Sequence, residues 1–395
     1  MTTATVDSKA LLAVPAAPKA TAASTMVEVA RAHGVSPIRQ LRESVALSFG
    51  RSRMKLHEYY AGGLYDPALT ARDKREFVGE RGSYLLNSGL ASKRLTSLRG
   101  AMRHKVLHTA MMETLGFRTT KTQAVVSDEQ RFGSVETCTD AASLRDFLMH
   151  RARFPLFGKP QSYSGSFGSA LIESREGDDL ILGNGKRIRL DAFCEEIVAE
   201  YASGYVLQSA LRQHPVLEEA AGRAVGTIRI VTVRRAAMPE VLYTLWKIPA
   251  PTAMSDNFWQ DGSMIAPIDP ETGIVGQVRA GSGVKGRNID THPATGATLT
   301  GLQLPDWQAA LTLAREGHAV MSEFGVIGWD IALTPAGPAI IEANANPHHM
   351  LYQLAHRRGI WNTDFAPVWG EVRARSKAML RRRIQQELGR VKKRA

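Results

Sequence analysis

Short apolar runs alternate with amphipathic segments along most of the chain, and the two patterns predict different elements. Short apolar runs rich in valine, isoleucine and leucine are typical of buried strands, and they occur at 123–126, 154–159, 170–172, 205–208, 227–233, 241–246, 328–334 and 337–344. Apolar residues spaced three or four apart predict helices, and they occur at 102–115, 191–201 and 305–324. Residues 35–98 also read as mostly helical, with an interruption at 59–67. This mixture predicts an α+β fold.

The segment 328–344 is the most informative part of the pattern. It reads as two apolar strands joined by a proline and glycine turn, which predicts a β-hairpin. Glu342 and Asn344 are two residues apart and therefore project from the same face. If the strands pair symmetrically about Ala336, Asp330 lies directly opposite Glu342. Three such oxygen ligands suit Mg²⁺; the alternative is a hairpin whose acidic residues only cap the edge of a sheet.

A second feature joins a basic residue to a loop of small residues. The apolar strand at 154–158 leads to Lys159, and a loop rich in serine and glycine follows at 161–169. Backbone N–H groups of such a loop can approach phosphate oxygens while the lysine supplies a point charge. The loop does not match the phosphate-binding pattern that ends in Gly-Lys-Ser/Thr, so a plain connection is the alternative. The loop and the hairpin in one chain are harder to explain independently.

Taken in order, these features resemble the ATP-grasp enzymes. The match is carried by Lys159 with its loop, the strand at 205–208, the Asp330 strand and the Glu342-x-Asn344 ending. Within these enzymes, the chain resembles the sugar-transfer-associated branch more closely still. The segments that carry this closer resemblance are 213–215, 226–232, 256–258, 292–296 and 328–332.

The resemblance runs from Lys105 to Gln353 and implies an α+β ATP-grasp fold in which two subdomains grip ATP. A helical N-terminal region and a basic C-terminal helix would flank it. The chain departs from the branch at 258–263, where a double glycine is expected after Asn-Phe.

The resemblance also implies a nucleotide site. Lys159 would hold the α- and β-phosphates, and Lys105 stands where the family has an earlier phosphate-contacting lysine; an ordinary solvated lysine is its alternative. The implied lid over the phosphates contains Ser164, Gly165, Ser166 and Gly168. The implied hinge against adenine, acting mainly through backbone groups, contains Gln208, Ser209 and Leu211. Gln208 has the alternative of facing solvent. The implied metal ligands are Asp330, Glu342 and Asn344.

Two basic residues are candidates for catalysis. Arg229 stands in the apolar strand at 227–233, where an unpaired guanidinium would be costly, so it needs an anionic partner. That partner is either a structural carboxylate or the transferred phosphoryl group, which the resemblance favours. Lys247 is a similar but weaker candidate. Asn257 and His292 lie in loops of the branch's pattern and would contact the acceptor; a solvated loop residue is the alternative for the histidine.

The implied reaction needs no protein nucleophile. ATP would phosphorylate a carboxylate, and an amine would attack the resulting acyl phosphate, with Mg²⁺, or Mn²⁺ in its place, neutralising phosphate charge. The substrates would be small-molecule or sugar-linked acids and amines. Two alternatives remain: a phosphotransferase that stops at a phosphorylated product, and a non-catalytic nucleotide- or RNA-binding protein that uses the basic tail.

The composition of the chain bears on its core, its location and its relation to membranes. The chain has 395 residues, of which 44% are hydrophobic, so it can bury a large core. Two cysteines form no disulfide framework or metal spacing, which favours a reducing, cytoplasmic location. No apolar run is long enough for a transmembrane segment. Self-association is left open.

Charge is concentrated at the C-terminus. Residues 371–395 contain ten Lys/Arg and two Glu, a net of +8 out of the formal +12. The tail lacks aromatic residues for base stacking, so a solvated helix is favoured over a nucleic-acid site. The expected division of the chain is a disordered leader at 1–34, a helical region at 35–102, an N-terminal ATP-grasp part at 103–153, a nucleotide-cradling subdomain at 154–225, a catalytic metal-binding subdomain at 226–360 and a basic tail at 361–395.

Overall fold

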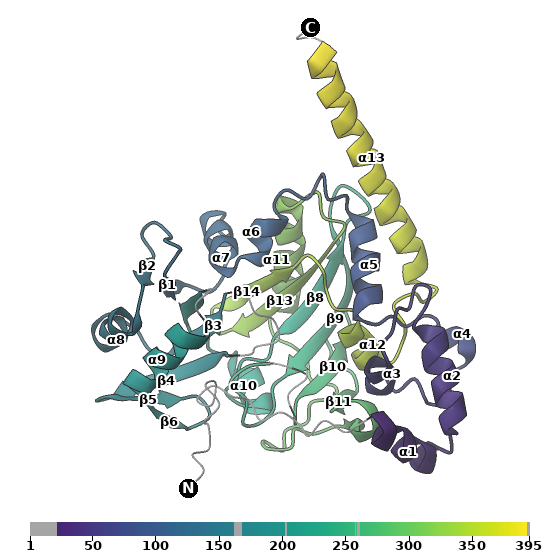
Figure 1. Cartoon of the computed structure of the whole chain (residues 1–395), viewed down its shortest axis with the longest axis horizontal. Helices are drawn as coiled ribbons and strands as arrows, with labels where there is room; N and C mark the ends of the chain where they lie inside the picture. Colours follow the sequence, from purple (N-terminus) through teal and green to yellow (C-terminus); the bar gives the residue numbers. More distant parts are fainter. Residues whose placement is uncertain (1–21, 162–167, 202–203, 257, 259–260, 393–395) are drawn as a thin grey trace.

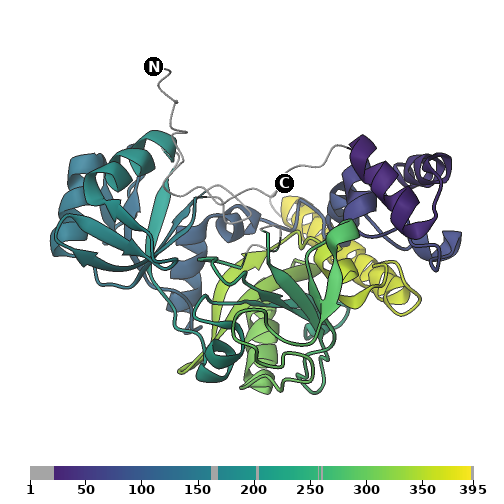
Figure 2. The same ribbon diagram turned by 90° about the horizontal axis from the view of Figure 1, so that it is seen from below.

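Two seven-stranded sheets carry the fold, and the chain completes the first before it starts the second. The computed structural model describes residues 22–161, 168–201, 204–256, 258 and 261–392. Figure 1 shows the first sheet on the left, the second in the centre and the N-terminal helices on the right. Figure 2 shows the same three parts from below, with the second sheet again between the other two. The expected α+β class is confirmed.

The first sheet has the strand order β2-β1-β7-β3-β4-β5-β6. Its strands are β1 (Thr122–Val126), β2 (Glu136–Cys138), β3 (Leu156–Pro160), β4 (Ala170–Glu176), β5 (Asp179–Leu182), β6 (Arg187–Arg189) and β7 (Tyr205–Ser209). Helices α8 (Ala141–His150) and α9 (Leu190–Glu200) cover one face with apolar side chains such as Phe147 and Phe193. The opposite face carries only a small apolar cluster, which includes Val125 and Val206.

The second sheet is antiparallel, with the order β12-β11-β10-β9-β8-β13-β14. Its strands are β8 (Ile228–Val233), β9 (Glu240–Ile248), β10 (Met264–Ile268), β11 (Val278–Ala280), β12 (Arg287–Ile289), β13 (Val326–Thr334) and β14 (Gly337–Asn344). The expected hairpin is β13–β14.

Helices cover both faces of the second sheet. On one face, even-numbered residues of β8 such as Ile228 and Ile230 pack in one apolar core with α6 (Arg99–Arg103), α7 (Lys105–Thr114), α10 (Pro215–Ala221) and α11 (Trp307–Val320). On the other face, Val231 and Val233 pack with α5 (Glu80–Leu90), α12 (Met350–His356) and α13 (Phe365–Lys392). Because side chains alternate along a strand, Arg229 lies on this second face.

The remaining helices form the N-terminal region and one turn near the edge of the second sheet: α1 (Ala22–His33), α2 (Pro37–Leu47), α3 (Leu56–Ala61), α4 (Ala71–Lys74) and the 3₁₀ helix η1 (Gly283–Lys285). Residues 22–33, which the sequence placed in a disordered leader, instead form α1. Val29 explains the difference, because it is fully buried against the other N-terminal helices. Residues 1–21 lie outside the described part.

The C-terminal helix α13 is the expected basic helix, and it extends away from the body (Figure 1). Trp369 and Val372 are buried near its start, and from residue 377 to residue 387 no side chain is buried. In the part of the chain that the structure describes, none of the helices combines the length and apolar character that a membrane span needs.

Trp329 should be a main support of this fold. It lies fully buried on β13, and its Nε1 donates to Thr232 Oγ1 at 3.0 Å. Trp329→Ala should therefore lower the free energy of unfolding by about 3–5 kcal/mol, because the surroundings cannot fill the cavity. Chemical denaturation followed by circular dichroism measures the change. The control is Val320→Ala, at a side chain 38% exposed on α11, and it should stay within about 0.5 kcal/mol. Equal losses in both variants would contradict the prediction.

Candidate functional site

The predicted acidic residues meet on one face of the second sheet. Strand pairing sets Asp330 of β13 directly opposite Glu342 of β14 on one side and Arg229 of β8 on the other. Asn344, two residues beyond Glu342, pairs with Gly328. Directly paired residues share a face, so all five positions project from the same side of the sheet. The predicted pairing of Asp330 with Glu342 is confirmed, but the hairpin is not symmetric about Ala336 throughout: Thr334 pairs with Gly337, and a register shift between Asp330 and Ile331 then sets Asp330 opposite Glu342.

Asp330 is held by two basic side chains. Its Oδ1 accepts from Arg229 Nε at 2.6 Å and its Oδ2 accepts from Arg229 Nη2 at 3.0 Å. Lys247 Nζ lies 3.3 Å from Oδ2. Burial would raise the pKa of Asp330, but Arg229 and Lys247 outweigh burial and hold this pKa well below its ordinary value. Asp330 is therefore ionised, and Arg229 has the structural carboxylate partner that its buried position requires.

Asp256 completes this group and was not assigned a role from the sequence. Its Oδ2 lies 3.0 Å from Lys247 Nζ and also accepts hydrogen bonds from the backbone N–H and the hydroxyl of Thr227. Burial would lower the pKa of Lys247, but Asp256 and Asp330 raise it above its ordinary value. Arg229, Lys247, Asp256 and Asp330 are called the charged cluster below. The sequence offered a signal for Asp256, because the residue lies in the stretch 256–258 that resembles the sugar-transfer-associated branch.

Gly328 gives the charged cluster the space it needs. A Cβ atom there would lie 2.8 Å from Pro347 Cβ and 3.5 Å from Arg229 Cδ. Real Cβ atoms do not approach a backbone-anchored proline this closely, so a side chain at position 328 would displace either the arginine or the chain after β14.

Lys159 approaches this face from the first sheet. The β3–β7 register pairs it with Val206, on the face opposite α8 and α9. Its side chain is only 7% exposed. Burial lowers the pKa of Lys159 to about 8; Glu342 opposes that shift and Lys105 adds to it. The strongest charge acting on Lys159 is thus the carboxylate of the β14 strand, which belongs to the other sheet.

Lys105 lies at the junction of the two sheets because α7 packs against both. Val106 of this helix packs on the first sheet and Met112 on the second. Lys105 Nζ donates to the carbonyl of Gln161 at 3.1 Å. Burial lowers the pKa of Lys105 while Glu342 raises it. The structure therefore brings Lys105, Lys159 and Glu342 together.

His108 lies one turn further along α7 and was missed by the sequence reasoning. It is 2% exposed, and burial together with the charge of Lys159 lowers its pKa to about 4. The imidazole is therefore neutral near pH 7. It adds no positive charge beside the two lysines.

Some backbone N–H groups of the predicted hinge already form hydrogen bonds within the protein. Ser209 N donates to Lys121 O at 2.8 Å and Ala210 N donates to Pro155 O at 3.0 Å. Leu211 N has no such partner in the described chain. Gln208 is 1% exposed, its Nε2 donates to Thr122 Oγ1 at 3.3 Å, and its Oε1 is buried with no partner among the described residues. The alternative in which Gln208 faces solvent is wrong, because this face of β7 is covered.

Other predicted residues are placed differently. Gly168 lies in a turn just before β4, an interior strand of the first sheet, and its carbonyl accepts from the Tyr205 hydroxyl at 2.9 Å. His292 is 1% exposed, and its Nδ1 accepts from the backbone N–H groups of Ala294 and Thr295. His292 thus stabilises its own turn, and in the described residues no contact joins it to the charged cluster. The predicted residues outside the described part are Ser164, Gly165, Ser166 and Asn257.

Glu342 and Asn344 retain oxygen atoms for a ligand. Both side chains are half-buried, and neither forms a hydrogen bond or ion pair with another described residue. Within the described chain, no three His, Cys, Asp or Glu side chains are grouped closely enough to hold a metal ion. A cation here would need Asn344 and oxygens from outside the protein. A small set of hard oxygen donors completed by phosphate oxygens fits Mg²⁺.

A buried polar network joins the N-terminal helices to the segment after β14. Asn87 of α5 donates through Nδ2 to Asn346 Oδ1 at 2.8 Å and to Pro347 O at 3.0 Å. The Oδ1 of Asn87 lies 2.8 Å from His349 Nε2, and His349 Nδ1 lies 2.9 Å from the Tyr243 hydroxyl. Burial lowers the pKa of His349 to about 3, so this histidine is neutral. The network assigns its proton to Nε2, and Tyr243 donates to Nδ1.

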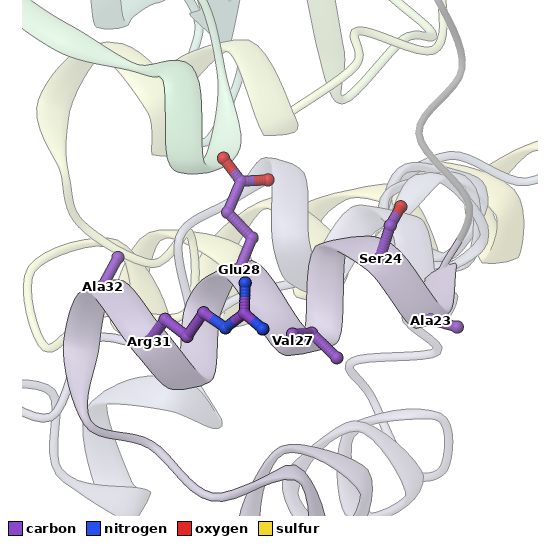
Figure 3. Close-up of a pocket in the computed structure, with 6 residues that line it drawn as sticks. All are labelled: Ala23, Ser24, Val27, Glu28, Arg31 and Ala32. Atoms are coloured by element: carbon purple, nitrogen blue, oxygen red, sulfur yellow. The ribbon is translucent and has the colours of Figure 1, made fainter.

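Enclosed cavities do not mark the site. A depression of about 700 Å³ is lined entirely by residues of α1, and Figure 3 shows these side chains along one helix: Ala23, Ser24, Val27, Glu28, Arg31 and Ala32. A second of about 450 Å³ lies between α11 and the β13–β14 turn. Neither includes a residue of the charged cluster, Lys105, Lys159 or Glu342.

Asn87→Ala should destabilise the protein more than its size suggests. The substitution leaves the buried Nε2–H of His349 and the carbonyl of Pro347 without partners, which costs about 1–3 kcal/mol in the free energy of unfolding. Denaturant unfolding measures this loss. Asn184→Ala, in an exposed turn of the first sheet, is the matched control and should stay within about 0.5 kcal/mol. If the Asn87 variant matched that control, the network would not support the segment after β14.

Solved structures similar to this chain are all distant. D-alanine–D-alanine ligase from Bacillus anthracis shares 14% identity over 77% of this chain and 82% of that chain, with a TM-score of 0.41. D-alanine–D-alanine ligase from Coxiella burnetii shares 13% identity over 75% of this chain and 62% of that one, with a TM-score of 0.42. The biotin carboxylase domain of Hydrogenobacter thermophilus 2-oxoglutarate carboxylase, solved with MgADP, ADP and bicarbonate, shares 11% identity over 74% and 50%, with a TM-score of 0.40.

Sequence comparison is more specific. No curated protein matches the chain. A family model described as sugar-transfer associated ATP-grasp matches residues 100–365, which is more than half of the 395 residues. The match contains both sheets, Lys105, Lys159 and the charged cluster, as the resemblance predicted. The chain therefore belongs to the sugar-transfer associated ATP-grasp family.

Proposed function

We propose that the protein is an ATP-dependent carboxylate–amine ligase that works through an acyl phosphate. The observation that carries the proposal is that Lys159 of the first sheet lies within the electrostatic influence of Glu342 of the second. Neither side chain forms an ion pair with another described residue. A buried lysine on one sheet and a half-buried carboxylate on the other would serve the two parts of a metal–nucleotide complex, the phosphates and the metal ion.

Lys159 and Lys105 would bind the phosphates. Two lysines beside one carboxylate leave an excess of positive charge, which suits a polyphosphate. His108 is neutral and leaves that charge unchanged. Adenine would meet the end of β7, where Leu211 N and the Oε1 of Gln208 lack partners in the described chain. The lid residues Ser164, Gly165, Ser166 and Gly168 stay a proposal from the family resemblance.

Asp330, Glu342 and Asn344 would hold Mg²⁺. Glu342 and Asn344 have unused oxygens, and the carboxylate of Asp330 can accept further interactions beside those from Arg229 and Lys247. Bound there with the nucleotide, Mg²⁺ would neutralise phosphate charge and align the γ-phosphate for transfer.

Arg229 and Lys247 would stabilise the transferred phosphoryl group. Asp330 fixes the Nε and Nη2 edge of Arg229, which leaves its Nη1 donors unassigned. Such a guanidinium is already oriented and desolvated, so it loses little freedom when negative charge develops beside it. Lys247, held between Asp256 and Asp330, keeps its proton over the working pH range.

Covalent catalysis by cysteine is not part of the proposal. Burial raises the pKa of Cys138 and that of Cys194 to about 12, so both remain thiols. The proposal that the acceptor is a small or sugar-linked acid rests on membership of the family. Asn257 would belong to the acceptor site by the same reasoning.

Nucleotide binding should be linked to a proton on Lys159. In the free protein this pKa is about 8, and phosphate oxygens would raise it. ATP affinity should therefore fall as the pH rises through about 8, and binding there should take up a proton. Calorimetry of Mg-ATP binding in buffers of different ionisation enthalpy measures this uptake.

Two variants make the test specific. Lys159→Ala should remove the proton uptake. Subtracting the proton uptake of this variant from that of the wild type removes the contribution of protons exchanged by ATP itself. Lys186→Ala, at an exposed lysine of the same subdomain, should retain it. Tight binding without pH dependence in the wild type would contradict the role of Lys159.

Phosphate release should require an acid and an amine together. A panel of amino acids and uronic acids, with ammonia or amino acids as amines, should yield ADP, phosphate and an amide. Glu342→Gln should lower kcat/KM by about 100-fold or more, because a carboxylate that binds the metal is lost. Glu316→Gln, exposed on α11, is the control and should match wild type. A phosphorylated product that accumulates without an amine would overturn the ligase and identify a phosphotransferase.

A further inference from the structure

Arg279 on β11 is a charged side chain without a partner. It is half-buried, and its Nε is shielded from solvent with no hydrogen-bond partner. In the described part of the chain its guanidinium forms no ion pair and no hydrogen bond. Leaving the shielded Nε–H unpaired is costly, and the Nη groups, which are not shielded in this way, stay open to a ligand. Arg279 is therefore unexplained by the fold alone.

The groups around Arg279 are donors. Burial lowers the pKa of Arg279 and the charge of Arg357 lowers it further, while Tyr65 opposes the shift; no carboxylate is among these groups. Tyr65 is 4% exposed, and its hydroxyl has no hydrogen-bond partner among the described residues. Three elements thus bring two guanidinium groups and a phenol together: β11, the end of α12 and the segment after α3.

Arg357 reaches this place through an uncommon backbone conformation. Its φ is +53°, in the left-handed region that arginine rarely adopts. The guanidinium passes close to Gly63, where a Cβ would lie 3.3 Å from its Nη1. Its one ion pair in the described chain is with Asp66 at 3.8 Å, and its side chain remains 41% exposed. Arg357 therefore has donors to spare on the side of Arg279.

The chain also leaves room beside Arg279. A Cβ at Gly286 would overlap its guanidinium, so the arginine lies directly over a bare backbone segment. The two carboxylates nearby do not satisfy it. Asp66 pairs with Arg357, and Glu28, whose side chain extends from α1 toward the pale-green ribbon in Figure 3, forms no ion pair with Arg279 in the described chain.

We propose that Arg279, Arg357 and Tyr65 form a binding site for an oxyanion, the phosphate or carboxylate group of a ligand. Arginine pairs bind such groups through parallel N–H···O bonds, and a phenol adds a third donor. The bound oxyanion supplies the hydrogen-bond acceptors that Arg279 lacks within the described chain.

This site is separate from the nucleotide site. Strand pairing places Arg279 opposite Ile265 and Ile265 opposite Lys247, so Arg279 is two strands from Lys247, about 10 Å along the sheet. Ile265 is fully buried between them. Tyr65 also lies outside the residues that match the family model.

The test measures anion binding by calorimetry in the full-length Lys159→Ala protein, which weakens phosphate binding at the nucleotide site. Inorganic phosphate and acetate are the probes. Saturable binding of either supports the site, and the preferred probe identifies the ligand group. Arg279→Gln and Arg357→Gln should each weaken binding by about 10-fold or more. Arg287→Gln, an exposed arginine on the adjacent strand β12, should leave it unchanged.

Stability separates this role from a structural one. Without ligand, Arg279→Gln should unfold at the same temperature as its parent or higher, because it removes an unpaired charge. A lower unfolding temperature, no saturable binding of either probe, or equal weakening by Arg287→Gln would overturn the proposal. Failure of ATP binding in the wild type would overturn the proposed ligase and leave this result standing.

Discussion

The charged cluster of Arg229, Lys247, Asp256 and Asp330 is the constraint on which the site depends. Arg229, Lys247 and Asp330 are buried on neighbouring strands and Asp256 is half-buried in the segment after β9; this grouping is tolerable only because each charge neutralises another. Removing one partner from such a group typically costs about 3–5 kcal/mol. The cluster therefore fixes the register of three strands as well as the charge of the site, and Glu342 follows because it pairs with Asp330.

Elements outside the family match support this arrangement from the same face of the second sheet. Asn87 comes from α5 and Trp369 from α13, and both contact His349, which closely follows β14. The N-terminal helical region, to which the sequence assigned no chemistry, thus fixes the chain that leaves Glu342 and Asn344.

Local patterns predicted more of the site than of its supports. Alternating apolar residues and a short turn were enough to predict the hairpin, and a bulge between Asp330 and Ile331 then shifts the pairing so that Asp330 lies opposite Glu342. Asp256 and Asn87 could not be found in this way, since Asp256 lies in an irregular segment after β9 and Asn346, a partner of Asn87, is 259 positions away in sequence. Burial decided the other differences: Val29 folds α1 out of the expected leader, and His292 turns inward to cap its own loop.

The two arginines show what burial alone can and cannot predict. An apolar strand around Arg229 implied an anionic partner, and the chain supplies Asp330. Arg279 occupies a similar strand on the same face of the sheet, two strands beyond Lys247, and the described chain supplies no acceptor. The desolvation cost applies to the buried guanidinium of Arg229 as a whole and, in the half-buried Arg279, to the shielded Nε. For Arg229 the fold supplies an acceptor, and the arginine belongs to the scaffold of the site. For Arg279 the fold supplies none, and the missing acceptor is evidence for a ligand.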